Sequence, residues 1–218
     1  PKVDMHNGHI IGGEALVRWQ NDKEMIYPDQ FIPVLEKNGY VIDVDNFIWN
    51  KVCACIKMME DKGIEPVPIS VNVSRMHVYQ EKFTENLKNM AGEYGIDPKY
   101  IPLEITESAF TKEEGSLFKK VQSLQGYGFK FSMDDFGSGY SSLGMLKSER
   151  VDEVKIDKTF VDDIATDKGK VLLGNVIRMI NELGIDMIAE GVETKEQADF
   201  LKENGCMYAQ GYYCLLYT

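Results

Sequence analysis

Long hydrophobic runs are absent from the sequence: no stretch of about 18 apolar residues occurs, so no transmembrane helix is predicted. No signal peptide is recognisable either. Cysteine is scarce, with four in 218 residues. Cys53 and Cys55 would lie on different faces of an expected helix, and Cys206 and Cys214 lie far along the chain. Free thiols are therefore favoured over disulfides or zinc ligands, and a cytoplasmic protein is expected.

Basic residues are outnumbered by acidic ones, since 24 Lys and Arg face 35 Asp and Glu and the net charge is -11. A grip on nucleic-acid backbone needs clustered Lys and Arg, so no nucleic-acid polymer is expected as a partner. The acidic excess is consistent with a solvated acidic surface. It is equally consistent with acids that converge in a pocket and bind divalent cations.

The chain alternates short β-rich segments with longer segments of helical periodicity, which predicts a parallel sheet. The expected strands are 11–19, 67–74, 100–106, 129–135, 151–157, 186–191 and 206–213, with a stub at 1–5. This number favours a closed (β/α)8 TIM-like barrel over an open doubly wound sheet. No Gly-rich phosphate-binding turn follows a strand, which also disfavours the open sheet. A single α/β domain over residues 1–218 is expected.

Nearly every expected strand carries a polar side chain toward its C-terminal end. In a (β/α)8 barrel those ends share one rim, where the active sites of this fold lie. We therefore expect a group of residues far apart in sequence to meet in space. They are Glu14, Asn72, Glu104, Asp134, Asp135, Lys155, Glu190 and Gln210.

Any single carboxylate of this group is as readily explained by a structural role. Several together would repel one another and raise their pKa values unless a cation compensated. Carboxylate and amide oxygens suit Mg²⁺ or Mn²⁺. Zinc would favour His or Cys, and the three histidines, His6, His9 and His77, do not lie at strand ends and are expected on the surface.

Asp134 and Asp135 are adjacent, although neighbouring side chains on a strand point to opposite faces. Where the strand ends, Asp135 can turn toward the pocket that Asp134 faces. Two metal ions about 3.5–4 Å apart could then share one carboxylate and stabilise both oxygens of a phosphoryl displacement. Lys155 could orient the hydroxide or meet the developing charge. The residues thus predict a metal-dependent phosphoester hydrolase.

Motifs along the chain resemble, in order, the signatures of the EAL-domain phosphodiesterases. They are "GEALVRW", "VNVS", "EITES", "DDFGSGYSSL", "KIDKTF", "AEGVET" and "AQGYY", from about residue 12 to residue 213. The resemblance implies hydrolysis of the bacterial second messenger cyclic di-GMP to linear pGpG, by in-line attack that expels the 3′ oxygen. It also implies a modified barrel whose first strand runs antiparallel to the next.

The resemblance assigns roles to single residues. The metal ligands it implies are Glu14, Asn72, Glu104, Asp134, Asp135 and Glu190, with Asp134 bridging two ions. Lys155 would hold the nucleophilic water, and Gln210 would help position water or metal. Ca²⁺ is expected to permit binding but to support cleavage poorly, because it is larger and less exacting in geometry.

Further residues are assigned to the substrate and to regulation. Arg18 would contact a phosphate, with Asp157 and Glu193 supporting the site. Tyr212 could stack on guanine, although an aromatic residue there is as often part of the core. Glu107 would steady the loop 136–143, which in the family couples metal binding to dimerisation, so a homodimer is expected.

Both ends depart from the family pattern. The chain opens within what resembles the first strand, so a truncated first strand and an upstream sensory or GGDEF domain are expected. The tail "CLLYT" lacks the usual proline. Barrel closure and guanine binding are the properties that these departures affect. Two alternatives to the enzyme are a receptor that binds cyclic di-GMP without cleaving it and a scaffold without nucleotide binding; the complete acidic set favours the enzyme.

Overall fold

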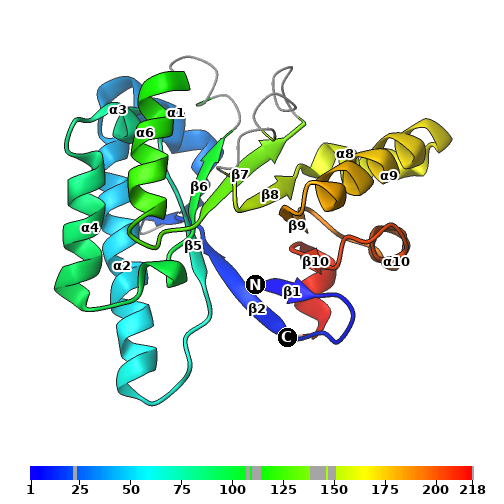
Figure 1. Ribbon diagram of the computed structural model, residues 1–218, viewed down its shortest axis with the longest axis horizontal. Helices are drawn as coiled ribbons and strands as arrows, with labels where there is room; N and C mark the ends of the chain where they lie inside the picture. Colours follow the sequence, from blue (N-terminus) through cyan, green and yellow to red (C-terminus); the bar gives the residue numbers. More distant parts are fainter. Residues whose placement is uncertain (22–23, 107–108, 110–113, 138–145, 147–150, 218) are drawn as a thin grey trace.

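A computed structural model of the chain describes residues 1–21, 24–106, 109, 114–137, 146 and 151–217 (Figure 1). Eight strands form a closed barrel in the order β1-β10-β9-β8-β7-β6-β5-β2. This confirms the predicted barrel. The strands are β1 (Lys2–Asp4), β2 (Ile10–Ala15), β5 (Ile69–Asn72), β6 (Leu103–Thr106), β7 (Phe131–Phe136), β8 (Glu153–Ile156), β9 (Asp186–Ala189) and β10 (Tyr208–Ala209).

The first strand is the antiparallel member of the barrel. Val3 of β1 pairs antiparallel with Ile10 of β2 on one side and with Ala209 of β10 on the other. All other neighbours in the barrel are parallel. The predicted antiparallel first strand is therefore confirmed, and the barrel closes although β1 has only three residues.

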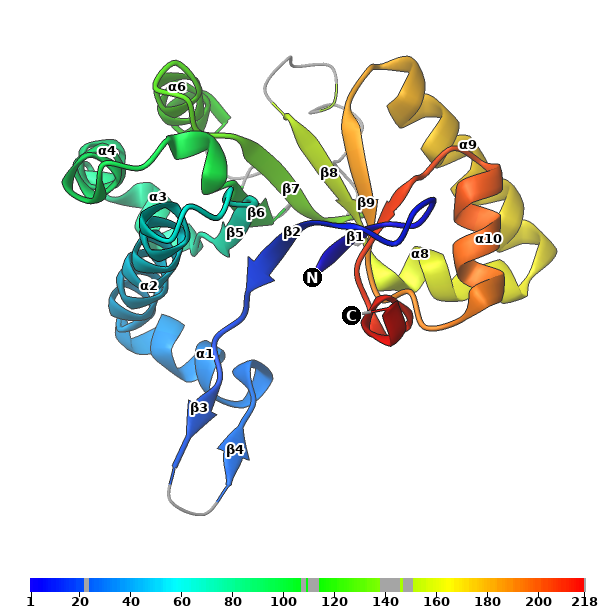
Figure 2. The same cartoon turned by 90° about the horizontal axis from the view of Figure 1, so that it is seen from below.

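Helices surround the barrel, with α1 to α6 on one side and α8 to α10 on the other (Figures 1 and 2). They are α1 (Pro28–Asn38), α2 (Val41–Asp61), α3 (Arg75–Tyr79), α4 (Phe83–Tyr94), α6 (Glu114–Gln125), α8 (Lys158–Asp162), α9 (Asp167–Glu182) and α10 (Lys195–Glu203). Short 3₁₀ helices are η1 (Pro98–Tyr100), η2 (Asp163–Ala165) and η3 (Tyr212–Tyr217). In the described part of the chain, no helix combines the length and apolarity needed to cross a bilayer.

The barrel wall separates an apolar layer from a polar interior. Leu103 and Ile105 of β6 are fully buried, because the strands of a parallel barrel are covered by helices outside and by side chains inside. Glu104, between them, is also buried and meets charged groups from other strands across the barrel. The core therefore lies mainly between strands and helices, and the barrel axis is reserved for charged side chains.

Two expected strands are shorter in the structure. The segment 11–19 ends as β2 at Ala15, and a separate hairpin of β3 (Trp19–Gln20) and β4 (Met25–Ile26) follows, which sequence reasoning missed. Figure 2 shows this hairpin projecting beside α1. The segment 206–213 forms only β10, because the backbone turns at Gly211, with φ of 148°, into η3.

The expectation that His77 lies on the surface is wrong. Its side chain is fully buried, stacks on Trp49 with ring centroids 4.3 Å apart, and places Nδ1 3.2 Å from Asp45 Oδ2. Ser74 caps the N-terminus of α3 by accepting from the amide of His77, which turns the ring toward α2. His77 is thus a buried packing residue, whereas His6 and His9 are exposed as expected.

Candidate metal centre

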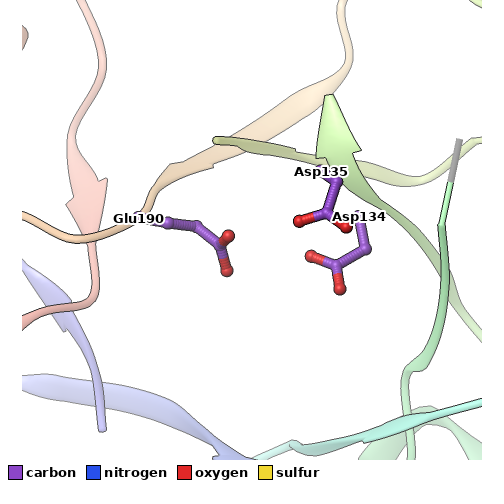
Figure 3. Close-up of side chains that lie close together, drawn as sticks. All are labelled: Asp134, Asp135 and Glu190. Carbon is purple, nitrogen blue, oxygen red and sulfur yellow. The ribbon is translucent and has the colours of Figure 1, made fainter. Parts of the chain in front are cut away.

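Three carboxylates converge at the C-terminal rim of the barrel. Asp134 and Asp135 of β7 point toward Glu190, which directly follows β9 (Figure 3). One oxygen from each of the three lies within 4.8 Å of the other two. This spacing would let a single cation contact all three side chains.

A bulge allows the two adjacent aspartates to share one pocket. Asp135 has φ of 55°, in the left-handed region, and the pairing of β7 with β8 shifts register between Met133 and Phe136. Such a bulge re-aims a side chain that regular alternation would send to the other face. Left-handed backbone costs an ordinary residue about 1–2 kcal/mol, and Asp is among the more tolerant types. The expected turn of Asp135 thus results from backbone strain at the rim.

Lys155 of β8 lies at the centre of the rim and is only 1% exposed. Its Nζ atom lies 2.7 Å from Glu104 Oε2, 2.8 Å from Asp134 Oδ1, 2.8 Å from Glu190 Oε1 and 3.3 Å from Glu14 Oε2. These acids come from four different parts of the barrel. The structure therefore brings together in space residues that the sequence separates by up to 176 positions, from Glu14 to Glu190 (190 − 14).

Two amide side chains hold the rim acids in place. Gln210, directly after β10, donates from Nε2 to Glu14 Oε2 at 2.8 Å and to Glu190 Oε1 at 2.7 Å. Asn72 Nδ2 donates to Glu14 Oε1 at 3.0 Å. Asn72 would have to present its amide oxygen to a cation, since an amide nitrogen is only a donor.

The acids of the rim are difficult to ionise together. Burial raises the pKa of Asp134 and of Asp135, with neighbouring acids adding to the effect. Burial, with Asp134 and Glu14 close by, raises the pKa of Glu190 to about 7 although Lys155 opposes the shift. One ammonium therefore does not compensate the whole charge of the cluster, and a further cation would be stabilised here.

Glu104 and Lys155 behave differently because they pair directly. Burial alone would raise the pKa of Glu104, but Lys155 and Lys2 together hold it below its usual value. Burial alone would lower the pKa of Lys155, but Glu104, Asp134 and Glu190 raise it well above its usual value. This part of the rim is a fully charged pair at neutral pH.

The donor set fits a hard divalent cation. Asp134 Oδ1 is buried and, although it lies 2.8 Å from Lys155 Nζ, has no hydrogen-bond partner in the described part of the chain. Carboxylate and amide oxygens of this kind suit Mg²⁺ and Mn²⁺. His77, the one buried histidine, pairs with Asp45 away from the rim, so the geometry does not favour zinc.

The residues expected to contact substrate differ in their surroundings. Arg18 is exposed, its Nη1 donates only to the carbonyl of Val17 at 2.9 Å, and its guanidinium lies 6.0 Å from the Tyr27 ring centroid. Tyr212 is 74% exposed, whereas its neighbour Tyr213 packs against the core. The side chains of Arg18 and Tyr212 are thus accessible to a ligand.

Asp157 and Glu193 make local contacts instead. Asp157 caps the N-terminus of α8 by accepting from the amide of Thr159 at 2.9 Å. Glu193 accepts from Lys158 Nζ at 3.0 Å. Both contacts order loops next to Lys155 and Glu190. Glu107, and most of the loop 136–143, lie outside the described residues, so their expected roles stay predictions.

Sequence reasoning missed Lys2 of β1. Its side chain is buried, and Nζ lies 3.1 Å from Glu104 Oε1 and 3.1 Å from Glu153 Oε1. The available signal was the need of Glu104 for a partner, because a buried carboxylate at that position is costly unless it is paired.

A cavity of about 390 Å³ opens beside the rim. It lies between α1, α2 and the ends of β2, β5 and β6. Its lining is mainly apolar and includes Leu16, Val17, Ile32, Ile48 and Val73, with Asn72 on the side of the rim. The carboxylate cluster therefore adjoins a space that can take an apolar or aromatic group.

Comparison with known proteins agrees with this geometry. Residues 1–216 match the EAL domain family. The chain is 32% identical over 214 residues to the bifunctional diguanylate cyclase/cyclic di-GMP phosphodiesterase MucR of Pseudomonas aeruginosa, covering 97% of this chain and 31% of MucR. It is 34% identical over 215 residues to the oxygen sensor protein DosP of Escherichia coli, covering 98% of this chain and 27% of DosP.

A solved structure described as the PaMucR phosphodiesterase in complex with c-di-GMP has a TM-score of 0.92 to this chain. The identity is 32%, and the match covers 98% of this chain and 87% of that one. The chain spans less than a third of the length of the two curated relatives. From its motifs, its barrel and this match over nearly all its residues, the chain belongs to the EAL domain family.

Proposed function

We propose that the chain is a metal-dependent phosphodiesterase that hydrolyses cyclic di-GMP to linear pGpG. The observation that carries the proposal is the rim itself, where Glu14, Glu104, Asp134 and Glu190 converge within 3.3 Å of one ammonium and Asp135 joins them. The similar MucR structure, described as a c-di-GMP complex, supports the choice of substrate.

Two Mg²⁺ or Mn²⁺ ions are the cofactors we propose. Asp134, with its unpartnered Oδ1, is the acid best placed to reach both ions. Glu14, Asn72 and Glu104 would complete one site, and Asp135 with Glu190 the other. Bound there, such ions make water more acidic and neutralise charge on phosphoryl oxygens.

The protein groups would then position the reactants. Arg18 would bind a phosphate oxygen, since its guanidinium is exposed and makes no ion pair in the described part of the chain. Lys155 and Gln210 would hold the attacking water in line with the scissile bond. The water oxygen forms a bond to phosphorus, the bond to the 3′ oxygen breaks, and that oxygen takes up a proton.

The cavity beside the rim would receive part of the nucleotide. Its apolar lining by Leu16, Ile48 and Val73 suits the faces of a nucleobase. Tyr212, being 74% exposed, could stack on a base. Asn72 lies both in the cavity lining and in the acidic rim, so a ligand filling the cavity would adjoin the cluster.

We further propose a bacterial cytoplasmic setting, a homodimer and fusion to an upstream sensory or GGDEF domain. The four free cysteines support a reducing compartment. The 31% and 27% of MucR and DosP that the chain spans support a multidomain context. Sedimentation with and without Mg²⁺ would test the dimer.

One assay tests the proposed activity. The purified chain is incubated with cyclic di-GMP and Mg²⁺ or Mn²⁺, and products are separated by chromatography. We expect linear pGpG, and loss of that product in Glu190→Gln. Binding without any linear product would instead indicate a receptor, and neither binding nor product would contradict both functions.

A further inference from the structure

Lys2 places a second ammonium inside the barrel, on the side opposite the rim. Its side chain is 5% exposed and also lines a cavity of about 340 Å³ at the N-terminal ends of the strands. Nζ donates to Glu104 Oε1 at 3.1 Å and to Glu153 Oε1 at 3.1 Å. The hydroxyl of Ser132 donates to the same Glu153 oxygen at 2.8 Å. Lys2 thus links β1 to β6 and β8 through charged contacts.

Charges alternate along the barrel axis as a result. Glu153 lies at the bottom, followed by Lys2, Glu104 and Lys155, and then by the remaining acids of the rim. Glu104 is held between the two ammonium groups, with Oε1 on Lys2 and Oε2 on Lys155. Its side chain is 0% exposed, so no water competes for either oxygen.

The contact with Lys2 fixes the orientation of Glu104. Because Oε1 is engaged from below, only Oε2 is directed toward the rim. Glu14 and Glu190 are oriented by the amide of Gln210, whereas the direct partners of Glu104 at its far oxygen come from Lys2. Without Lys2 the carboxylate could rotate, and its charge would lack a partner below.

We infer that Lys2 is a positioning residue for the metal centre, which acts from the bottom of the barrel by holding Glu104 with one oxygen toward the rim. The inference rests on the proposed metal-dependent function. Partners that orient a metal ligand from behind typically change metal affinity by about 10–100-fold when removed. Lys2 is therefore expected to influence metal affinity without touching the substrate.

A double-mutant cycle in Mn²⁺ binding tests this role. Isothermal titration calorimetry on wild type, Lys2→Met, Glu104→Gln and the double variant gives four dissociation constants. We expect Lys2→Met to weaken Mn²⁺ binding by about tenfold in the wild type and by less than about twofold in the Glu104→Gln background. Lys130→Met, which removes an exposed lysine from the same lower cavity, should bind Mn²⁺ like wild type.

The outcomes separate the inference from the function on which it rests. If wild type binds no Mn²⁺, the proposed metal centre fails. If wild type binds and a folded Lys2→Met binds equally well, or if the loss is the same in both backgrounds, only the role of Lys2 fails. If Lys2→Met does not fold, recovery of folding by added Glu104→Gln would support the pairing. Absence of that recovery would contradict it.

Discussion

Lys155 Nζ lies 2.7 Å from Glu104 Oε2, the shortest of its contacts with the four carboxylates of the rim. The two side chains come from β8 and β6 and are both almost fully buried. The ammonium therefore serves as an internal cation at the point where the acids converge. It stabilises their charge and also lies where we propose that phosphoryl transfer takes place.

Replacing Lys155 by Ala should nearly abolish turnover while cyclic di-GMP binding stays measurable. Loss of one group that stabilises developing charge typically lowers kcat by about 10²–10³-fold. Turnover is measured as pGpG formation at saturating Mg²⁺, and binding by calorimetry in Ca²⁺. Thermal unfolding with Mg²⁺ present checks that the variant is folded. Turnover equal to wild type would refute the proposed role of Lys155.

The metal-free protein should lose stability as the pH rises from about 5 to about 7. Glu190 has a pKa of about 7 in the fold against an ordinary 4.5, so the folded state binds its proton more strongly than the unfolded state. Stability therefore decreases while Glu190 ionises in the fold, by about 3 kcal/mol across the shift. Asp134 and Asp135, whose pKa values are also raised, act in the same direction.

Denaturant unfolding in EDTA at several pH values measures this trend. Glu190→Gln should flatten it, whereas Glu196→Gln, at an exposed glutamate, should leave it unchanged. Added Mn²⁺ should reverse the slope, because the metal competes with protons for the same oxygens. Stability that increases from pH 5 to pH 7 in EDTA would show that the rim acids do not carry raised pKa values.

The strained backbone at Asp135 predicts a difference between two variants that both lack its carboxylate. Asp135→Gly should be more stable than Asp135→Ala by about 1 kcal/mol in EDTA, because φ of 55° is unfavourable for a residue with a Cβ atom. Both should lose Mn²⁺ affinity equally. Chemical denaturation and calorimetry give the two quantities, and an Ala variant as stable as the Gly variant would rule out the left-handed conformation.

Ca²⁺ should support nucleotide binding but not efficient cleavage. The rim offers oxygen ligands that Ca²⁺ can use, yet Ca²⁺ accepts more ligands at longer distances than Mg²⁺. The comparison is pGpG formation by one preparation in Ca²⁺, Mg²⁺ and Mn²⁺, with exchange from Ca²⁺ into Mn²⁺ as the control for intact protein. Equal rates in Ca²⁺ and Mg²⁺ would contradict the expectation.

Much of the fold followed from local patterns in the sequence. The strand carrying Asp134 was expected at 129–135 and is found at Phe131–Phe136, because the buried apolar run before the acids is a strong signal. The convergence of Glu14 with Glu190 followed from the general rule that strand ends of a barrel meet at one rim. The antiparallel β1 came from the family resemblance, since no local pattern encodes strand direction.

Other features depend on tertiary contacts that sequence patterns do not encode. The left-handed conformation of Asp135 is imposed by the shift in register against β8, and Asp is not a reliable signal of such a bulge. Lys2 lies in a three-residue strand with too few positions to show which face is buried. His77 is buried because α3 packs on α2, which its spacing from the strand ends could not indicate.

The most direct test of the metal centre is the anomalous scattering of crystals grown with Mn²⁺ and a non-hydrolysed nucleotide. The account predicts two Mn²⁺ peaks about 3.5–4 Å apart at the barrel rim, with Asp134 in contact with both. No Mn²⁺ at the rim, or a single ion bound away from Asp134, Asp135 and Glu190, would contradict it.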